Sequence, residues 1–232
     1  MANINGDLGN ILNFLSAAAA LGTASMGLVD ATKVFGGGPS NFGFGYIRSA
    51  VEPFLTDPPG VPPAFGKSQI LRTLRAAWIN GVATADQKAK AKALIHLHLV
   101  KGNATALATA AGVDPAILQS LADKTAGGEK PSPEEINALG QFDVVLSAIL
   151  DAGYERGDQK YRNSCKVLAM LVSACLGVAG GGIVFGITDY FGHWPSFISF
   201  LVGFCATPLA PIAKDLASSL QAAASAVQLV KR

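Results

Sequence analysis

Two apolar runs stand near the carboxyl end of the chain, VLAMLVSACLGVAGGGIVFGIT at residues 167–188 and SFISFLVGFCATPLAPIA at residues 196–213. Neither run contains an Asp, Glu, Lys or Arg, and the segment DYFGHWP at residues 189–195 joins them. A helix needs about 20 apolar residues to cross a hydrocarbon core of roughly 30 Å. Both runs come close to that length, so the sequence predicts a transmembrane helical hairpin.

A third apolar segment, residues 8–29, lies near the amino terminus. A signal peptide opens with a basic region, whereas the first cationic side chain here is Lys33. We therefore interpret the segment as a retained membrane helix. The alternative is a buried or surface-lying helix, because Asn10, Asn13 and the alanine run at residues 17–20 make it only moderately apolar.

The composition of the 232 residues is that of a small integral membrane protein, since 50% are hydrophobic and 15% are charged. A net charge of +2 is too small to favour nucleic acid. The cysteines Cys165, Cys175 and Cys205 form an odd, unclustered set, which indicates reduced packing residues rather than a disulfide framework or a metal site.

We predict an all-α integral membrane protein with about three transmembrane helices and a small cytoplasmic helical domain. The predicted parts are an amino-terminal transmembrane helix at 1–30, a Gly/Pro/aromatic-rich connector at 31–66, a cytoplasmic helical domain at 67–165 that continues into the second span, a transmembrane hairpin at 166–213 and a cytoplasmic amphipathic tail at 214–232. The Gly and Pro content of the connector predicts irregular structure. Its aromatic residues predict packing on the helical domain or on the membrane interface.

Within the helical domain, local signals predict where helices begin. Asp114 followed by Pro115 is typical of a capped helix start. The run Ser132-Pro133-Glu134-Glu135 combines a capping residue, a first-turn proline and acidic residues. The helix from Pro133 has no clear stop before the second span, although Gly153 and Gly157 are weak points. Asp151 and Glu155 place like charges four residues apart, which predicts either partner charges from another helix or subunit or solvated charges at the interface.

The basic residues predict an orientation, because cytoplasmic flanks of membrane helices are rich in Lys and Arg. In a three-span arrangement all such flanks fall on one side, which puts the amino terminus outside and residues 31–165 and the carboxyl tail in the cytoplasm. The predicted location is the inner membrane, with several passes. A two-span arrangement would place both ends in the cytoplasm.

Glycines in the second span predict close helix packing. Gly177 with Gly181, and Gly182 with Gly186, have the small-xxx-small spacing that lets helix backbones approach in lipid. We expect these residues to make helix contacts within the chain or between copies, with an intermolecular component favoured.

Two further features are candidate sites. Asn10 and Asn13, with Ala17, Ala20 and Ala24, trace a small or polar stripe on the first helix, and such a stripe faces protein or water rather than lipid. Helix packing is favoured over pore lining. Asp189 and His193 could form a pH-sensitive pair at the outer turn, although a capped turn is the favoured interpretation.

No catalytic, cofactor-binding or metal-binding residues are predicted. Gly66-Lys67-Ser68 resembles the end of a phosphate-binding loop, but the spacing to Gly60 is wrong and prolines interrupt it. His96 and His98 are two residues apart and face different sides of a helix, so they do not share a metal geometry.

The leading hypothesis is a non-enzymatic, homo-oligomeric bacterial-type membrane protein, in its channel or pore-like form with a cytoplasmic helical collar. It expects membrane lipid and further copies of the chain as partners, and no nucleic acid or cofactor. The alternative is an accessory or anchor subunit whose residues 67–150 bind another protein. An intramembrane enzyme or transporter is disfavoured because the middles of the spans carry no ionisable residue.

Overall fold

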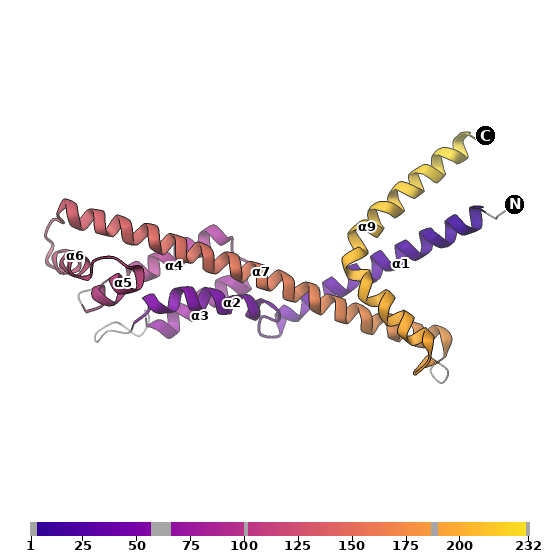
Figure 1. Ribbon diagram of the computed structural model, residues 1–232, viewed down its shortest axis with the longest axis horizontal. Helices are drawn as coiled ribbons and strands as arrows, with labels where there is room; N and C mark the ends of the chain where they lie inside the picture. Colours follow the sequence, from indigo (N-terminus) through magenta and orange to yellow (C-terminus); the bar gives the residue numbers. More distant parts are fainter. Residues whose placement is uncertain (1–3, 57–65, 100–101, 187–189, 231–232) are drawn as a thin grey trace. The chain divides into compact units, whose positions relative to one another are not determined.

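The computed structural model describes residues 4–56, 66–99, 102–186 and 190–230, and every regular element in these ranges is helical. The elements are α1 Ile4–Ala31, the short 3-10 helix η1 Thr32–Val34, α2 Ser40–Val51, the 3-10 helix η2 Glu52–Phe54, α3 Lys67–Ile79, α4 Thr84–His96, α5 Ala104–Ala111, α6 Pro115–Gly127, α7 Pro133–Phe185 and α9 Trp194–Val230 (Figure 1). The prediction of an all-helical chain is confirmed for the described residues.

Three helical segments are long and apolar enough to cross a membrane, namely Gly9–Val34, Pro133–Phe185 and Trp194–Leu216. In the second of these the apolar part is the run from residue 167 onward. The prediction of three membrane-length helices is therefore confirmed, and the fold is compatible with a protein embedded in a bilayer.

The chain forms two compact units. One consists of Ser40–Tyr161 and is called the bundle unit below; the other combines Met1–Pro39 with Arg162–Arg232 and is called the membrane unit. Figure 1 shows α2 to α6 gathered beside the first half of α7 within the bundle unit. The bundle unit begins at Ser40, well before the predicted domain start at residue 67.

Helix α2 corrects the prediction of an irregular connector over residues 31–66. It buries Phe44, Ile47 and Val51 in the core of the bundle unit, at three- and four-residue spacing. The helix forms although it contains Gly43 and Gly45, because tertiary packing outweighs their low helix propensity. Part of the connector, residues 57–65, lies outside the described residues.

Gly153 and Gly157 do not interrupt α7. They allow α2 to pack closely against it. A Cβ added at Gly153 would lie 2.5 Å from the Cβ of Ala50, and one added at Gly157 would lie 3.0 Å from the carbonyl oxygen of Gly43. Any larger side chain at these two positions would push α2 away. The predicted weak points are therefore contact points, and α7 continues as one helix of 53 residues.

The predicted helix starts are confirmed. Asp114 is the N-cap of α6, and its carboxylate accepts hydrogen bonds from the backbone N–H groups of Ala116 and Ile117. Helix α7 begins at Pro133, directly after Ser132. The preceding α6 ends at Gly128, which has a φ of 73° and thus takes the left-handed conformation that glycine adopts without strain.

The core of the bundle unit is made of large apolar side chains from all of its helices. Phe142 is fully buried, and its ring lies edge-on to that of Phe54 with centroids 6.2 Å apart. Trp78 makes similar edge contacts with Tyr154 at 6.3 Å and Tyr161 at 6.1 Å. Burial on this scale is what allows a unit of about 120 residues to be stable in water.

Helix α9 corrects the prediction of a separate amphipathic tail. It runs without a break from Trp194 to Val230 and contains Pro208 and Pro211. Figure 1 shows that α9 changes direction partway along its length. Prolines inside a helix remove backbone hydrogen bonds and kink it, so the tail is the second arm of a bent helix rather than a new element.

The second arm of α9 packs antiparallel to α1. Gly22 of α1 faces Ala206 and Ala210 of α9, while Phe14, closer to the amino terminus, shares a groove with Leu216. Within the membrane unit the starting end of α1 and the finishing end of α9 consequently lie at the same end (Figure 1).

Candidate functional site

The α7–α9 contact in the membrane unit is built from small residues. A Cβ added at Gly177 would lie 2.7 Å from the carbonyl oxygen of Ser199 and 3.1 Å from the Cα of Gly203. A Cβ added at Gly203 would lie 2.5 Å from the carbonyl oxygen of Ser173. The two backbones therefore touch at glycines on both sides, which is the packing that replaces the hydrophobic effect between helices in lipid.

The same contact extends toward the amino-terminal end of the apolar run. Ala169 and Ser173 are fully buried and continue the four-residue repeat of Gly177 and Gly181. Thr207 of α9 donates a hydrogen bond from its hydroxyl to the carbonyl oxygen of Ala169 at 3.2 Å. We call the residues Ala169, Ser173, Gly177, Gly181, Ser199, Gly203 and Thr207 the small-residue seam. The sequence prediction found the glycines of α7 but missed Gly203 and Thr207, which repeat every four residues with Ser199 and could have been found by that spacing.

Tyr190 closes the seam at the hairpin turn. Its side chain is fully buried, with its ring stacked on Phe185 at a centroid distance of 6.1 Å and edge-on to Phe191 at 5.2 Å. The Tyr190 hydroxyl occupies the space where a side chain at Gly181 would be, next to the Ser199 hydroxyl. The absence of a side chain at Gly181 thus leaves the space that the Tyr190 ring and hydroxyl fill.

Gly182 and Gly186 differ from the predicted packing pair. A Cβ added at Gly182 would make ordinary contact, at 3.5 Å, with the ring of Tyr190. Gly186 follows the last residue of α7, has a φ of 83° and would meet nothing within 4 Å. Gly186 therefore ends the helix by the left-handed conformation that favours glycine, and a Cβ added there would contact none of the described residues.

Helix α1 uses one face to pack on α9. A Cβ added at Gly22 would lie 2.6 Å from the carbonyl oxygen of Ala206 and 2.7 Å from the Cβ of Ala210. Ala18, Ser25 and Val29 are buried on the same face. The sequence prediction missed this face because a single glycine among alanines gives little signal.

The predicted stripe of α1 lies on the other side of the helix. Asn10 and Asn13 are exposed, and so are Ala17, Ala20 and Ala24. The face that packs on α9 and the stripe are therefore separate surfaces of one membrane-length helix. The stripe is not covered by any described part of the chain.

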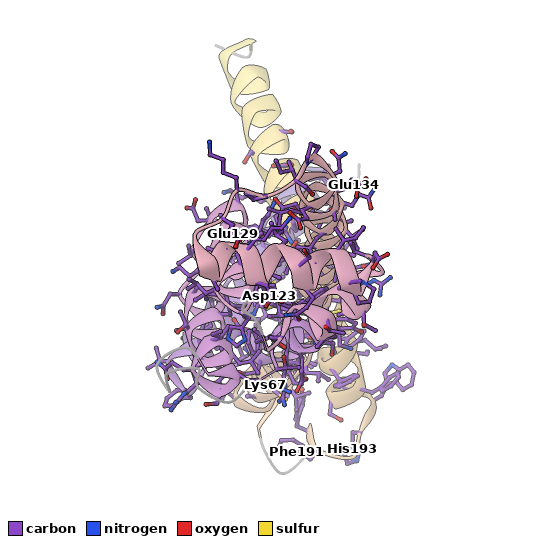
Figure 2. The ribbon with its side chains drawn as sticks, turned by 90° about the vertical axis from the view of Figure 1, so that its left-hand side faces the viewer. Lys67, Asp123, Glu129, Glu134, Phe191 and His193 are labelled. Carbon is purple, nitrogen blue, oxygen red and sulfur yellow. The ribbon has the colours of Figure 1, made fainter. Side chains whose placement is uncertain are left out.

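The predicted pair of Asp189 and His193 stays a prediction, because Asp189 lies outside the described residues. His193 is exposed at the turn, as is Phe191 (Figure 2). The His193 backbone N–H donates to the carbonyl oxygen of Tyr190 at 3.4 Å, and the Ser196 hydroxyl donates to the carbonyl oxygen of His193 at 2.8 Å. These backbone bonds are those of a capped turn leading into α9.

In the bundle unit, a row of charges joins α4 to α7. Lys88 lies 2.6 Å from Asp151, and Lys92 lies 3.2 Å from Asp143. His96 Nε2 lies 2.6 Å from the other oxygen of Asp143. From Lys88 to Lys92, one turn along α4, the partner steps back along α7 from Asp151 to Asp143, so the helices run antiparallel. Asp151 has the partner from another helix that the sequence predicted, and these half-exposed pairs contribute modestly to stability.

His98 lies inside the bundle unit, whereas His96 pairs with Asp143 on α7. It is fully buried, and because a carbonyl oxygen can only accept, its Nδ1–H donates to the carbonyl oxygen of Thr56 at 3.0 Å. Asn103 donates to the carbonyl oxygen of His98 at 3.1 Å, and its side chain also meets the Thr56 hydroxyl. The two histidines therefore serve different contacts, as expected from their spacing.

The start of α7 is held by hydrogen bonds and an ion pair to Glu135. The Ser132 N–H donates to Glu135 at 2.7 Å and the Glu135 N–H donates to the Ser132 hydroxyl at 3.3 Å, which is a reciprocal capping box. Lys124 and Ser120 of α6 also bond the Glu135 carboxylate. The Lys124 hydrogen bond, followed by those from Ser132 and Ser120, lowers the pKa of Glu135 to about 2. This site joins α6 to α7.

The described residues offer no group of three or more His, Cys, Asp or Glu side chains that could hold a metal ion. Cys165, Cys175 and Cys205 are free thiols. Comparison with protein-family models, curated proteins and solved structures gives no match. The functional proposal below therefore rests on the packing surfaces of the membrane unit.

Proposed function

We propose that this chain is a non-enzymatic membrane protein that assembles with copies of itself in a bacterial inner membrane, as a channel or pore-like assembly with a cytoplasmic helical collar. The observation that carries the proposal is the two-sided character of α1. One face is filled by α9, through Gly22, whereas the face with Asn10 and Asn13 is exposed.

The exposed amides are the reason to expect a protein partner. A polar side chain in hydrocarbon without a hydrogen-bond partner is unfavourable, and polar residues in spans normally face protein or a water-filled cavity. An asparagine amide both donates and accepts, so the same stripe on a second copy is a complementary surface. The stripe continues after the asparagines through Ala17, Ala20 and Ala24, whose small side chains let two such helices approach closely.

The proposed orientation follows from the basic residues. Lys33, Arg48 and the cluster at residues 156–166 favour a cytoplasmic bundle unit and an external amino terminus. For the carboxyl end the basic residues Lys214, Lys231 and Arg232 favour the cytoplasm, whereas the antiparallel packing of α1 on α9 favours the side of the amino terminus. Labelling single cysteines at Gly6 and Ser225 with an impermeant maleimide in intact cells distinguishes these two arrangements.

Particle mass in mild detergent tests the assembly. We expect a defined symmetric multimer of this chain alone, and we expect the double substitution Asn10→Leu, Asn13→Leu to shift it toward monomer. Met26→Leu changes an exposed residue of α1 outside the stripe and is the matched control. A wild-type monomer would contradict the proposal. A monomer that co-purifies with another protein would support the alternative of an accessory subunit that binds through residues 67–150.

Ion flux into liposomes tests the channel form separately. If the asparagines line a pore between copies, reconstituted protein will conduct ions and the double asparagine variant will not. Sealed vesicles without conductance, at a mass that shows a multimer, would contradict the channel form and leave a packed assembly.

A further inference from the structure

Helix α2 has apolar residues on two faces, and the described part of the chain covers only one of them. Phe44, Ile47 and Val51 are buried in the bundle core. On the outer side, Phe42 is 56% exposed and Tyr46, four residues later, is 43% exposed. Two large aromatic rings one helical turn apart form a continuous patch, which we call the α2 aromatic face.

The chain connection keeps the start of α2 within reach of the end of the first candidate span. The first candidate span ends at Val34, and α2 begins at Ser40. Six residue steps reach at most about 22 Å even when fully extended. The start of α2 therefore stays within that reach of the point where the chain leaves the membrane, whatever the arrangement of the two units.

The residues around the α2 aromatic face suit a lipid interface. Phe35, directly after the span, is 83% exposed, and Arg48 on α2 is an exposed cation that pairs with Glu52 at 3.4 Å. Aromatic side chains are favoured at the boundary between hydrocarbon and headgroups, and exposed Arg is attracted to anionic lipid. A water-facing helix has no such reason to present two neighbouring rings.

We propose that the α2 aromatic face lies in the membrane interface, with Phe42 and Tyr46 inserted at the level of the lipid headgroups. The occupant of this face is the bilayer itself. This goes beyond the proposed self-assembly, because it concerns how the bundle unit meets lipid and does not depend on the number of copies.

Spin-label accessibility in proteoliposomes containing anionic phospholipid tests the proposal on the full chain. Cys165, Cys175 and Cys205 are first replaced by alanine, and labels are placed by Phe42→Cys and, independently, Tyr46→Cys. The control is Val144→Cys, at an exposed residue of the bundle unit that lies 23 residues before Val167, a distance of about 34 Å along α7. Thermal unfolding of each labelled protein confirms that it is folded.

We expect the ratio of oxygen accessibility to nickel-chelate accessibility to be several-fold higher at positions 42 and 46 than at position 144, because oxygen concentrates in lipid and the chelate stays in water. A ratio at 42 and 46 equal to that at 144 would place the face in water and overturn the proposal. Protection from both reagents would show that protein covers the face, which would also overturn it. An equal ratio at the three positions overturns this proposal whether or not the chain forms a multimer, and a monomeric particle overturns only the proposed self-assembly.

Discussion

Each of the two units packs internally with a different kind of side chain: large apolar residues in the bundle unit and small residues in the membrane unit. The bundle unit buries large residues such as Phe142, Leu146 and Tyr154 in its core. The membrane unit buries Ala169, Ser173 and Gly203 at its helix contact, while Val184 and Trp194 are exposed by 77% and 71%. This difference is the one expected if the bundle unit packs in water and the membrane unit packs in lipid.

The physical reason is that the hydrophobic effect acts only against water. In the bundle unit, burying large apolar area provides most of the stability. In lipid, large apolar side chains lose nothing by staying exposed, so close backbone contact between small residues provides the packing instead. The bundle unit should therefore be most sensitive to the loss of large buried side chains, and the membrane unit to larger side chains at its glycine contacts.

The largest effect is expected in the bundle core. Phe142→Ala removes a fully buried ring that contacts Phe54, and should lower the free energy of unfolding of the bundle unit by about 3 to 5 kcal/mol. Ile136→Ala, at a residue on the same helix that is 56% exposed, should change it by less than about 0.5 kcal/mol. Chemical unfolding followed by far-UV circular dichroism in detergent measures both, and equal effects would deny the buried position of Phe142.

The seam should respond to added volume rather than to its loss. Gly177→Leu places a side chain against Ser199 and Gly203, and we expect a loss of about 1 to 3 kcal/mol from overpacking. Gly180→Leu, three residues later, meets nothing within 4 Å and should be neutral or slightly stabilising. Thermal melting of the purified protein in detergent compares them, and a harmless Gly177→Leu would refute the seam.

A smaller effect is expected where α7 begins. Ser132→Ala removes the hydroxyl that accepts from the Glu135 N–H, and the loss of an N-cap costs about 1 kcal/mol. The substitution touches only the bundle unit, so the melting of the membrane unit should not move. Unfolding monitored at Trp78, in a protein with Trp194→Phe, reports the bundle unit alone.

The charge of Glu135 should make the stability of the bundle unit depend on pH. The folded-state pKa is about 2 against an ordinary value of 4.5, so its contribution is complete above pH 4.5 and is lost as the pH falls toward 2. Glu135→Gln retains the side-chain hydrogen-bonding group and should flatten the pH dependence of bundle stability in this window. An unchanged slope between pH 4.5 and pH 2 would show that other groups cause it.

Local sequence signals gave much of the fold, and tertiary packing explains the rest. The starts of α6 and α7 were predictable because Asp114-Pro115 and Ser132 to Glu135 act on their own backbone. Helix α2 was not, because it depends on contacts with Gly153 and Gly157 more than 100 residues away. The α7 side of the seam was visible in its glycine spacing, whereas the continuity of α9 through Pro208 and Pro211 was not, because such prolines are compatible with either a bend or an end of a helix.

The account depends on the surroundings of the α7–α9 hairpin, and sedimentation of cell lysates without detergent tests it most directly. We predict that the full chain stays in the membrane pellet after washing at high salt and at alkaline pH, and that it enters solution only when detergent is added. A monodisperse protein in the detergent-free supernatant would contradict the account.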